Sequence, residues 1–318
     1  MRVLVTGGAG FIGANLCRLL VTLPEVESVT VLDDLSSGDA ANVADVGINL
    51  VRGSILDREV LAELADGATH VIHLAARPSV PRSVKDPVTS HAVNATGTLF
   101  VLEACRRAGP GRMPHVILAS SSSVYGDCPE PHKHEDLPTR PLSPYGASKL
   151  ATEAYALAYA GSYGLPILPF RFFNVYGPLQ PAGHAYAAVI PAFVSAALKG
   201  RAVTIYGDGE QVRDFTYVGT VARVLADAAV RRVTSTTPLN LAFGTRVSLL
   251  HLKNALETVL GRPVEAEFLS ARAGDIRESQ ASSQLLLRRF PSVRPVPLDE
   301  GLRLTVTWFE KTQGATTH

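Results

Sequence analysis

The first hydrophobic segment of the chain runs directly into a glycine-rich turn. Residues 3–5 are apolar, and Gly7, Gly10 and Gly13 follow in a G-x-x-G-x-x-G array. The leucines of segment 14–20 then recur at helical spacing. In this strand–turn–helix order the glycines allow a tight turn, a close approach of backbone to a pyrophosphate, and close helix–strand packing. We therefore predict a dinucleotide-binding turn whose helix N-terminus faces phosphate.

A second apolar segment, 29–32, ends in a carboxylate. Asp33 lies twenty residues beyond Gly13, the spacing at which a dinucleotide fold places an acid on the adenosine ribose hydroxyls. An acid here would repel a 2′-phosphate, so the pattern favours NAD over NADP. The alternative interpretation is a structural turn followed by an unrelated Asp.

Apolar and helical segments alternate as far as about residue 175. Strands are predicted at 48–53, 71–76 and 116–119, and helices at 58–64 and 93–108. The segment 71–76 is nearly all apolar, as expected of a parallel strand covered on both faces, and His73 within it is interpreted as a core residue. The alternation predicts an α/β fold with a doubly wound parallel sheet of the Rossmann type.

Beyond residue 175 the pattern becomes mixed and rich in loops, which predicts a smaller mixed C-terminal domain that covers the substrate. We place the NAD-binding domain at 1–174, with a returning segment at about 214–244, and the substrate-binding domain at 175–318. Helices are predicted at 187–199 and 221–231. The segment 238–241 is predicted to return to the main sheet as a strand.

Composition narrows the class of protein further. The 318 residues are 46% hydrophobic and 19% charged, which is ample for a buried core. Thirty basic residues against 29 acidic ones give a net charge of +1, so nothing indicates a nucleic-acid or membrane surface. No signal-peptide cleavage pattern or membrane-length apolar run is present. Cys17, Cys105 and Cys128 lack metal-type spacing, and we interpret them as reduced thiols of a cytoplasmic protein with no metal site.

Two groups of residues carry candidate chemistry. The serine run 120–123 follows a buried strand, at the edge where open α/β sheets bind ligands, although serine runs are also common in solvated loops. Tyr145 and Lys149 lie on one face of a helix for which Ser143 is the predicted N-cap and Pro144 the first residue. A free tyrosine has a pKa of about 10, but a nearby ammonium and a cationic nicotinamide both favour phenolate. The alternative is an aromatic residue packed near a surface lysine.

Two arginines in the second half of the chain are harder to interpret. Arg213 and Arg272 are either ordinary surface charges or a clamp on a substrate diphosphate, for which the guanidinium geometry is well suited. Composition leaves both interpretations open.

In combination, the motifs resemble the extended short-chain dehydrogenase/reductase family, and within it the NAD-dependent nucleotide-sugar epimerases that act at C4 of UDP-glucose and UDP-N-acetylglucosamine. The resemblance extends from Gly7 to about Ser282. The motifs that carry it, in chain order, are the three glycines, Asp33 with 35–38, 73–76, Asn94, 120–126, Tyr145 with Lys149, 174–178, 213–215 and Arg272-x-Gly274-Asp275.

The resemblance implies a role for each matching residue. Ser121 would bond the sugar O4, Tyr145 would be the catalytic base, and Lys149 would hold the nicotinamide ribose and lower the tyrosine pKa. The NAD-binding residues would be Gly7, Gly10, Phe11, Ile12, Gly13, Asp33, Asp34, Ser36, Ser37, Gly38, Ile55, Leu74, Ala75, Ala76, Asn94, Tyr145, Lys149 and Phe172. The substrate-binding residues would be Val80, Ser121, Ser123, Tyr145, Asn174, Ala188, Val189, Tyr206, Arg213, Arg272, Asp275 and Ser279.

Within the second set, Asn174, Arg213 and Arg272 would contact the diphosphate and uridine, and Tyr206 the uracil. Ser279 would lie beside the C2 substituent of the sugar, where family members restricted to glucose and galactose tend to have a tyrosine. A small residue there implies that N-acetyl sugars are also accepted. A shift of one residue, to Glu278 or Gln280, is the alternative.

Some positions depart from the family pattern. Ser54 stands where an Asp is usual, which puts the adenine contact near Ile55 in doubt, and Ala188 and Thr220 replace the usual Asn and Asp. The acid pair that nucleotide-sugar dehydratases carry is replaced by Ser122 and Ser123. The related decarboxylases also keep an acid there.

The arginine typical of uronate 4-epimerases is also absent, because Leu179 stands in its place. A plain 4-epimerase is therefore expected, and the resemblance also implies a homodimer formed through the helices from Val93 and Tyr145. A ketoreductase or dehydratase, a uronate 4-epimerase, and a non-enzymatic NAD sensor remain as alternatives. The sequence leaves open the physiological sugar, the nucleotide (UDP or dTDP) and the direction of flux.

Overall fold

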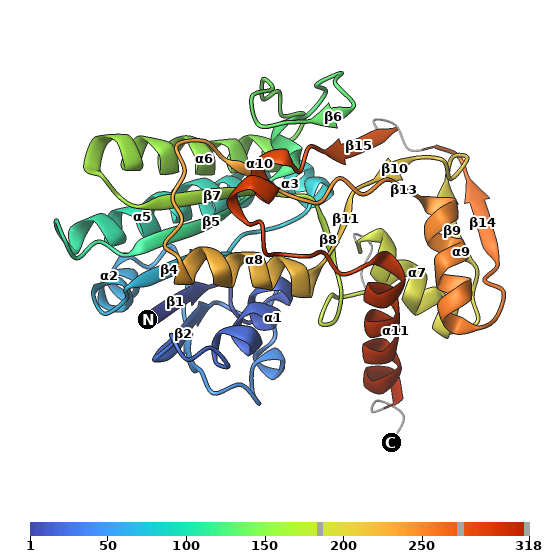
Figure 1. The fold of residues 1–318 in the computed structure, drawn as a ribbon, viewed down its shortest axis with the longest axis horizontal. Helices are drawn as coiled ribbons and strands as arrows, with labels where there is room; N and C mark the ends of the chain where they lie inside the picture. Colours follow the sequence, from blue (N-terminus) through green and yellow to red (C-terminus); the bar gives the residue numbers. More distant parts are fainter. Residues whose placement is uncertain (183–186, 272–276, 315–318) are drawn as a thin grey trace.

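The computed structural model describes residues 1–182, 187–271 and 277–314. Figure 1 shows a broad sheet with helices on both faces, joined to a smaller lobe that contains α7, α9, α11, β9 and β14. Arg272 and Asp275, two of the predicted substrate-binding residues, lie outside the described ranges.

The central sheet has seven parallel strands in the order β12-β7-β5-β4-β1-β2-β3. Its strands are β1 (Arg2–Thr6), β2 (Ser28–Asp33), β3 (Asn49–Arg52), β4 (His70–His73), β5 (His115–Ser121), β7 (Ile167–Phe172) and β12 (Leu239–Leu241). The order runs outward from β1 in both directions. It therefore reverses between β1 and β4, the point at which such folds bind a ligand. The predicted doubly wound α/β fold is confirmed.

Alternation along β1 explains why helices cover both faces of this sheet. Val3 and Val5 pack into one core together with α1 (Phe11–Leu20), α8 (Val218–Val230) and α10 (Gln284–Arg289). Leu4 points to the opposite face and packs into a second core, with α2 (Arg58–Asp66), α5 (Gly97–Arg107) and α6 (Pro144–Tyr163). In Figure 1, α1 and α8 lie below the sheet and α6 lies above it.

The smaller lobe has a third core of its own, which includes Phe193, Leu252 and Leu302. Its elements are α7 (Val189–Leu198), β9 (Val203–Tyr206), β10 (Val212–Arg213), β13 (Val247–Ser248), α9 (Leu249–Leu260), β14 (Ala266–Leu269), β15 (Glu278–Ala281) and α11 (Leu298–Gly314). β14 pairs with β9, and a four-stranded sheet has the order β13-β10-β15-β6, in which β6 is the short strand His132–Lys133.

The remaining elements of the described ranges are short. They are α3 (Val80–Lys85), α4 (Pro87–His91), β6 (His132–Lys133), β8 (Asn174–Tyr176), β11 (Phe215–Tyr217), a π-helix at Ala92–Thr96, and 3₁₀ helices at Ala40–Asn42 and Ser122–Val124. The chain crosses between the parts more than once, since α8, β12 and α10 pack on the large sheet although they lie in the C-terminal half of the sequence. Among the helices in the described ranges, none is both long and apolar enough to cross a bilayer.

Several element boundaries differ from the predictions. β4 ends at His73 and not at residue 76, and the Leu74 amide still donates to the Thr6 carbonyl at 3.0 Å before the chain leaves the sheet. β5 continues through Ser120 and Ser121, so half of the serine run is strand and not loop. α8 starts at Val218, three residues earlier than predicted. Hydrogen bonds to neighbouring strands set the ends of β4 and β5. The pattern of apolar residues along the sequence does not reveal these hydrogen bonds.

Candidate active site

The glycine-rich turn has the tight geometry that its sequence predicts. Gly7 has φ of +73°, and a Cβ there would lie 2.6 Å from the Ala75 amide nitrogen. A Cβ on Gly13 would lie 2.2 Å from the Gly7 carbonyl oxygen. These two positions therefore require glycine. Gly10 is the N-cap of α1 and provides no side-chain cap, so the first-turn amides of Phe11 and its neighbours are left for a ligand to bind.

Asp33 lies next to this turn, at the end of β2. Its carboxylate is 7% exposed and accepts hydrogen bonds from the amides of Ala9 and Leu35, both at 2.9 Å. Burial raises the pKa of Asp33, and these two hydrogen bonds oppose the rise. A Cβ on Gly38 would lie 2.8 Å from the Ala9 carbonyl carbon, so the loop after β2 packs on the glycine turn. Asp34, Ser36 and Ser37 are exposed residues of the same loop.

The remaining predicted cofactor residues surround the same edge of the sheet. Leu74, Ala75 and Ala76 follow β4 and are partly buried. Ile55 is buried against α5, where a Cβ on Gly97 would lie 2.5 Å from its Cδ1 atom. Phe172, the last residue of β7, is the register partner of Ser121.

Asn94 is 1% exposed, and its amide group is held by protein partners. Its Oδ1 accepts from the Arg77 amide at 2.7 Å, and its Nδ2 donates to Ser148 Oγ at 3.0 Å. Asn94 therefore ties the loop after β4 to helix α6, which carries the candidate catalytic residues.

Helix α6 begins as predicted and presents Tyr145 and Lys149 one turn apart. Ser143 Oγ accepts from the Gly146 amide at 3.1 Å, and Pro144 is the first helical residue. Lys149 is 4% exposed, and its Nζ donates to the Ala119 carbonyl of β5 at 2.9 Å. The alternative of a surface lysine beside a packed aromatic is therefore wrong.

Ser121 completes the group from the end of β5. Its hydroxyl is hydrogen-bonded to Tyr145 and donates to Ser123 Oγ at 3.1 Å. The Ser123 amide in turn donates to Ser121 Oγ at 3.1 Å. The structure therefore brings Ser121, Ser123 and Tyr145 into one hydroxyl network, with the Lys149 ammonium buried one turn further along α6.

The electrostatics differ from our expectation for the tyrosine. Burial raises the pKa of Tyr145, and the hydrogen bond with Ser121 only partly opposes this rise. Burial also lowers the pKa of Lys149 to about 8. The predicted lowering of the Tyr145 pKa thus does not arise from these side chains by themselves, because desolvation outweighs it.

Two predicted substrate residues meet in the sheet of the smaller lobe. Arg213 on β10 is the register partner of Ser279 on β15, so both side chains lie on one face. Glu278 and Gln280 alternate to the other face. There the Glu278 carboxylate accepts from Arg246 at 3.1 Å, and Gln280 Nε2 donates to the Gly244 carbonyl at 2.6 Å. Among residues 278–280, the side chain of Ser279 therefore lies on the same face of the sheet as that of Arg213.

The other predicted substrate residues come from separate elements. Asn174 begins β8, and its Nδ2 donates to the Asp214 carbonyl at 3.1 Å. Tyr206 ends β9, Val189 begins α7 after its N-cap Ala188, and Val80 begins α3 with 40% of its surface exposed.

One buried carboxylate that organises this region had no assigned role in the sequence analysis. Asp214 is 0% exposed, and its Oδ2 accepts from the amides of Gly244 at 3.0 Å and Ala281 at 3.1 Å, while Oδ1 accepts from the Thr245 hydroxyl at 2.9 Å. Asp214 thus fixes the strand of Arg213 against the strand of Ser279. An acid directly before the aromatic segment 215–217 was the available signal, and its partners lie 30 to 67 residues away.

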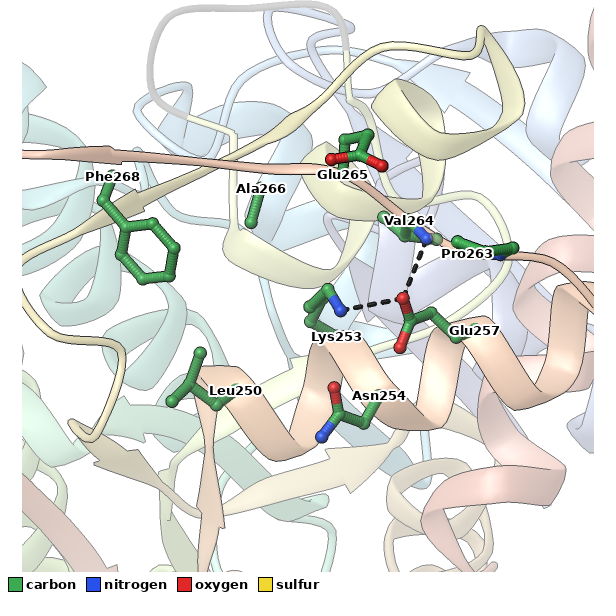
Figure 2. Close-up of a pocket in the computed structure, with 9 residues that line it drawn as sticks. All are labelled: Leu250, Lys253, Asn254, Glu257, Pro263, Val264, Glu265, Ala266 and Phe268. Atoms are coloured by element: carbon green, nitrogen blue, oxygen red, sulfur yellow. Dashed lines mark hydrogen bonds and ion pairs between the residues drawn. The ribbon is translucent and has the colours of Figure 1, made fainter.

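Two cavities lie elsewhere on the molecule. Figure 2 shows one of about 350 Å³ between α9 and β14, where the Glu257 carboxylate accepts from Lys253 Nζ and from the Val264 amide. The other, of about 630 Å³, is lined mainly by polar residues around β6 and α10. None of the predicted site residues lines either cavity.

Comparison with known proteins agrees with this geometry. The model of the NAD dependent epimerase/dehydratase family matches residues 3–242. The chain is 38% identical to UDP-glucose 4-epimerase of Mycolicibacterium smegmatis, over 97% of this chain and 98% of the relative. It is also 33% identical to dTDP-glucose 4,6-dehydratase of Mycobacterium tuberculosis, over 97% of this chain and 93% of that relative.

Solved structures are equally similar. The UDP-glucose 4-epimerase of Thermus thermophilus in complex with NAD has a TM-score of 0.87 and 39% identity, covering 98% of this chain and 99% of that one. The UDP-N-acetylglucosamine 4-epimerase of Methanobrevibacter ruminantium, in complex with UDP-N-acetylmuramic acid, has a TM-score of 0.90 and 35% identity, covering 98% of both chains. The chain belongs to the NAD-dependent epimerase/dehydratase family.

Proposed function

We propose that this enzyme inverts the configuration at C4 of a UDP-sugar, interconverting UDP-glucose and UDP-galactose. The observation that carries the proposal is the hydroxyl network of Ser121 and Tyr145 beside the buried Lys149 ammonium, with serines at 122 and 123. This network provides one acid–base group and no second acid. The 38% identity to a UDP-glucose 4-epimerase supports the proposal.

The residues at the carboxyl edge of the sheet fit an NAD molecule. The glycine turn has room for backbone contact, uncapped amides lie at the start of α1, and a carboxylate lies beside them at Asp33. We propose that these groups hold the pyrophosphate and the adenosine ribose, and that Lys149 contacts the nicotinamide ribose. NAD, when bound there, would accept a hydride from sugar C4 and return it.

The side chains of the site would manage the accompanying proton. Tyr145 takes the proton of the sugar O4 hydroxyl and later gives it back, while Ser121 hydrogen-bonds the same oxygen. Asn174 and Arg213 hold the diphosphate and Tyr206 faces the uracil, which allows the 4-keto sugar to turn its other face toward the site.

A dehydratase is the second candidate, because a dTDP-glucose 4,6-dehydratase is 33% identical to this chain. Elimination of water requires an acid and a base at C5 and C6 in addition to the tyrosine. Ser122 and Ser123 occupy the positions where such acids are expected. A serine hydroxyl is a poor acid or base at neutral pH, so the composition of the site favours epimerisation. Leu179 similarly argues against a uronate substrate.

The side chain at position 279 bears on the range of sugars that the site accepts. Ser279 has a small side chain on the face of β15 that carries Arg213, so we propose that UDP-N-acetylglucosamine is also a substrate. The solved UDP-N-acetylglucosamine 4-epimerase is consistent with this proposal.

Exposed apolar side chains gather on α3, α4 and α6, where Val84, Val88 and Tyr155 are 65%, 77% and 41% exposed. We propose that a second copy of the chain covers them. Three free, buried cysteines support a reducing, cytoplasmic location.

Incubation of the purified enzyme with UDP-glucose and no added cofactor tests the proposal. We expect UDP-galactose to form and NAD to be released on denaturation. Formation of a 4-keto-6-deoxy sugar would assign a dehydratase, and a requirement for stoichiometric NADPH would assign a reductase.

A further inference from the structure

A buried ion pair lies behind the candidate catalytic residues and has no part in the mechanism above. Glu153 on α6 and Arg171 on β7 have side chains only 3% and 5% exposed. Arg171 donates from Nε and Nη2 to the two carboxylate oxygens, each at 2.9 Å. Such two-point pairing is the strongest form of this interaction.

The position of the pair places it next to the active site. Tyr145, Lys149 and Glu153 follow one another at intervals of four residues, so they form one row along α6. Arg171 is the register partner of Ser120, which precedes Ser121 on β5. The pair is therefore one helical turn beyond Lys149.

The ion pair is held from several sides. The Arg171 guanidinium lies 4.7 Å from the centre of the Tyr125 ring, and its Nη1 donates to the Glu135 carbonyl at 3.3 Å. The Tyr125 hydroxyl in turn donates to Asn240 on the next strand at 2.7 Å. Because Arg171 is fixed in this way, the Glu153 carboxylate also has a fixed position.

Two titratable side chains near Lys149 are Glu153 and His73, and they differ in charge. Burial lowers the pKa of Lys149 to about 8, and Glu153 opposes this change. His73 on β4 is hydrogen-bonded at both ring nitrogens to threonine hydroxyls, and burial lowers its pKa to about 3, so it adds no charge. The Arg, Lys, His and Glu side chains of α3, α4 and α5 are exposed or partly exposed. Glu153 is thus the anion that faces the buried ammonium, with Arg171 behind it and the Tyr145 phenol one turn in front.

We propose that Glu153 is a positioning residue which, paired at two points with Arg171, keeps Lys149 in its charged form inside the active site. The two-point pairing with the Arg171 guanidinium compensates for the burial of the Glu153 carboxylate. The carboxylate then stabilises the Lys149 ammonium against desolvation. The consequence for catalysis rests on the proposed function, in which a charged Lys149 supports Tyr145.

The titration of Lys149 provides a direct test, because the chain has only six lysines. Lysine labelled with ¹³C at the ε carbon can be followed by NMR from pH 6 to 11, and Lys149→Met assigns the resonance. In Glu153→Gln the midpoint should fall by about one pH unit or more, because the anion is lost and the Arg171 cation is left unpaired. The alkaline limb of kcat/KM for UDP-glucose should move to lower pH by the same amount.

Two further variants distinguish the effect of the Glu153 charge from a failure of the variant to fold. Glu153→Gln combined with Arg171→Met removes both charges, so this variant should fold and show a smaller fall of the Lys149 midpoint than the single variant. Glu153→Asp keeps the charge and should restore the wild-type titration. If Glu153→Gln does not fold, the double variant and Glu153→Asp decide the question.

The matched control is Asp227→Asn on the surface of α8, where Arg231 also pairs at two points, at 2.8 and 2.6 Å. This variant should leave the Lys149 midpoint unchanged. Folded Glu153 variants with a wild-type midpoint would overturn the proposal. A shifted midpoint in an enzyme without epimerase activity would support the charge coupling and reject the proposed function.

Discussion

At the scale of single residues, the site depends on groups whose protonation is set by burial. Tyr145 and Lys149 lie on one helix face, yet burial moves their pKa values in opposite directions, up for the phenol and down for the ammonium. Both shifts favour the neutral forms. The charged forms needed for proton transfer therefore depend on further charges, such as the Glu153 carboxylate.

The first prediction concerns the base itself. Tyr145→Phe should retain NAD and substrate binding but lose turnover by about a hundredfold or more, because the group that exchanges the O4 proton is gone. Steady-state kcat with UDP-glucose, together with the NAD content of the purified protein, measures both effects. A kcat near that of the wild type would show that another residue is the base.

The second prediction concerns the range of sugars. Ser279→Tyr should suppress the N-acetyl substrate selectively, by about tenfold or more in kcat/KM, since overpacking costs about 1–3 kcal/mol for the ligand that needs the space. Glu278→Gln, on the opposite face of β15, is the control and should change neither sugar. An equal loss for both sugars, or a wild-type enzyme that rejects the N-acetyl sugar, would refute the role of Ser279.

At the scale of elements, the pairing of the short strands β10 and β15 in the smaller lobe depends on one buried side chain, that of Asp214. β10 and β15 pair over only two residue positions, and Asp214 adds hydrogen bonds to the Ala281 amide and to the turn at Gly244. Because Arg213 and Ser279 lie on these strands, their relative position follows from that carboxylate.

Asp214→Asn should therefore disturb substrate binding more than chemistry. The amide group of asparagine would face amide donors, and each donor left unpaired costs about 1–3 kcal/mol. We expect a lower Tm and a KM for UDP-glucose that rises more than kcat falls. Asp208→Asn, an exposed residue bonded to Arg277, provides the control. Unchanged KM in a folded Asp214→Asn enzyme would contradict this prediction.

At the scale of the whole molecule, the exposed apolar residues are distributed unevenly. Val84, Val88, Leu142 and Tyr155 lie on or next to α3, α4 and α6, which pack against one another on the outside of the larger part. Exposed apolar side chains grouped on neighbouring helices commonly mark an interface.

Tyr155→Asp should convert a dimer of the 33.8 kDa chain into a monomer, because it places a charge in the proposed interface. Light scattering coupled to gel filtration measures the mass of each species. Phe268→Asp on β14, where the side chain is 54% exposed, is the matched control and should remain dimeric. A wild-type protein that is already monomeric would exclude the proposed dimer.

The sequence by itself determined the parts of this protein whose geometry is local. The glycine turn, the acid at the end of the second strand, and the capped helix with Tyr145 and Lys149 each involve few consecutive residues, and the structure has them as predicted. Their conformation depends on turn sterics, capping and helical spacing, which a short segment specifies.

Only the tertiary structure decided which distant residues share an environment. The pairing of Arg213 with Ser279, the partners of Asp214 and the ion pair of Glu153 with Arg171 join residues 18 to 67 positions apart. Tertiary structure likewise fixed the end of β4, the strand character of Ser120 and Ser121, and the pKa of Tyr145. These features follow from strand register and from burial, which arise when the whole chain packs together and cannot be read from local pattern.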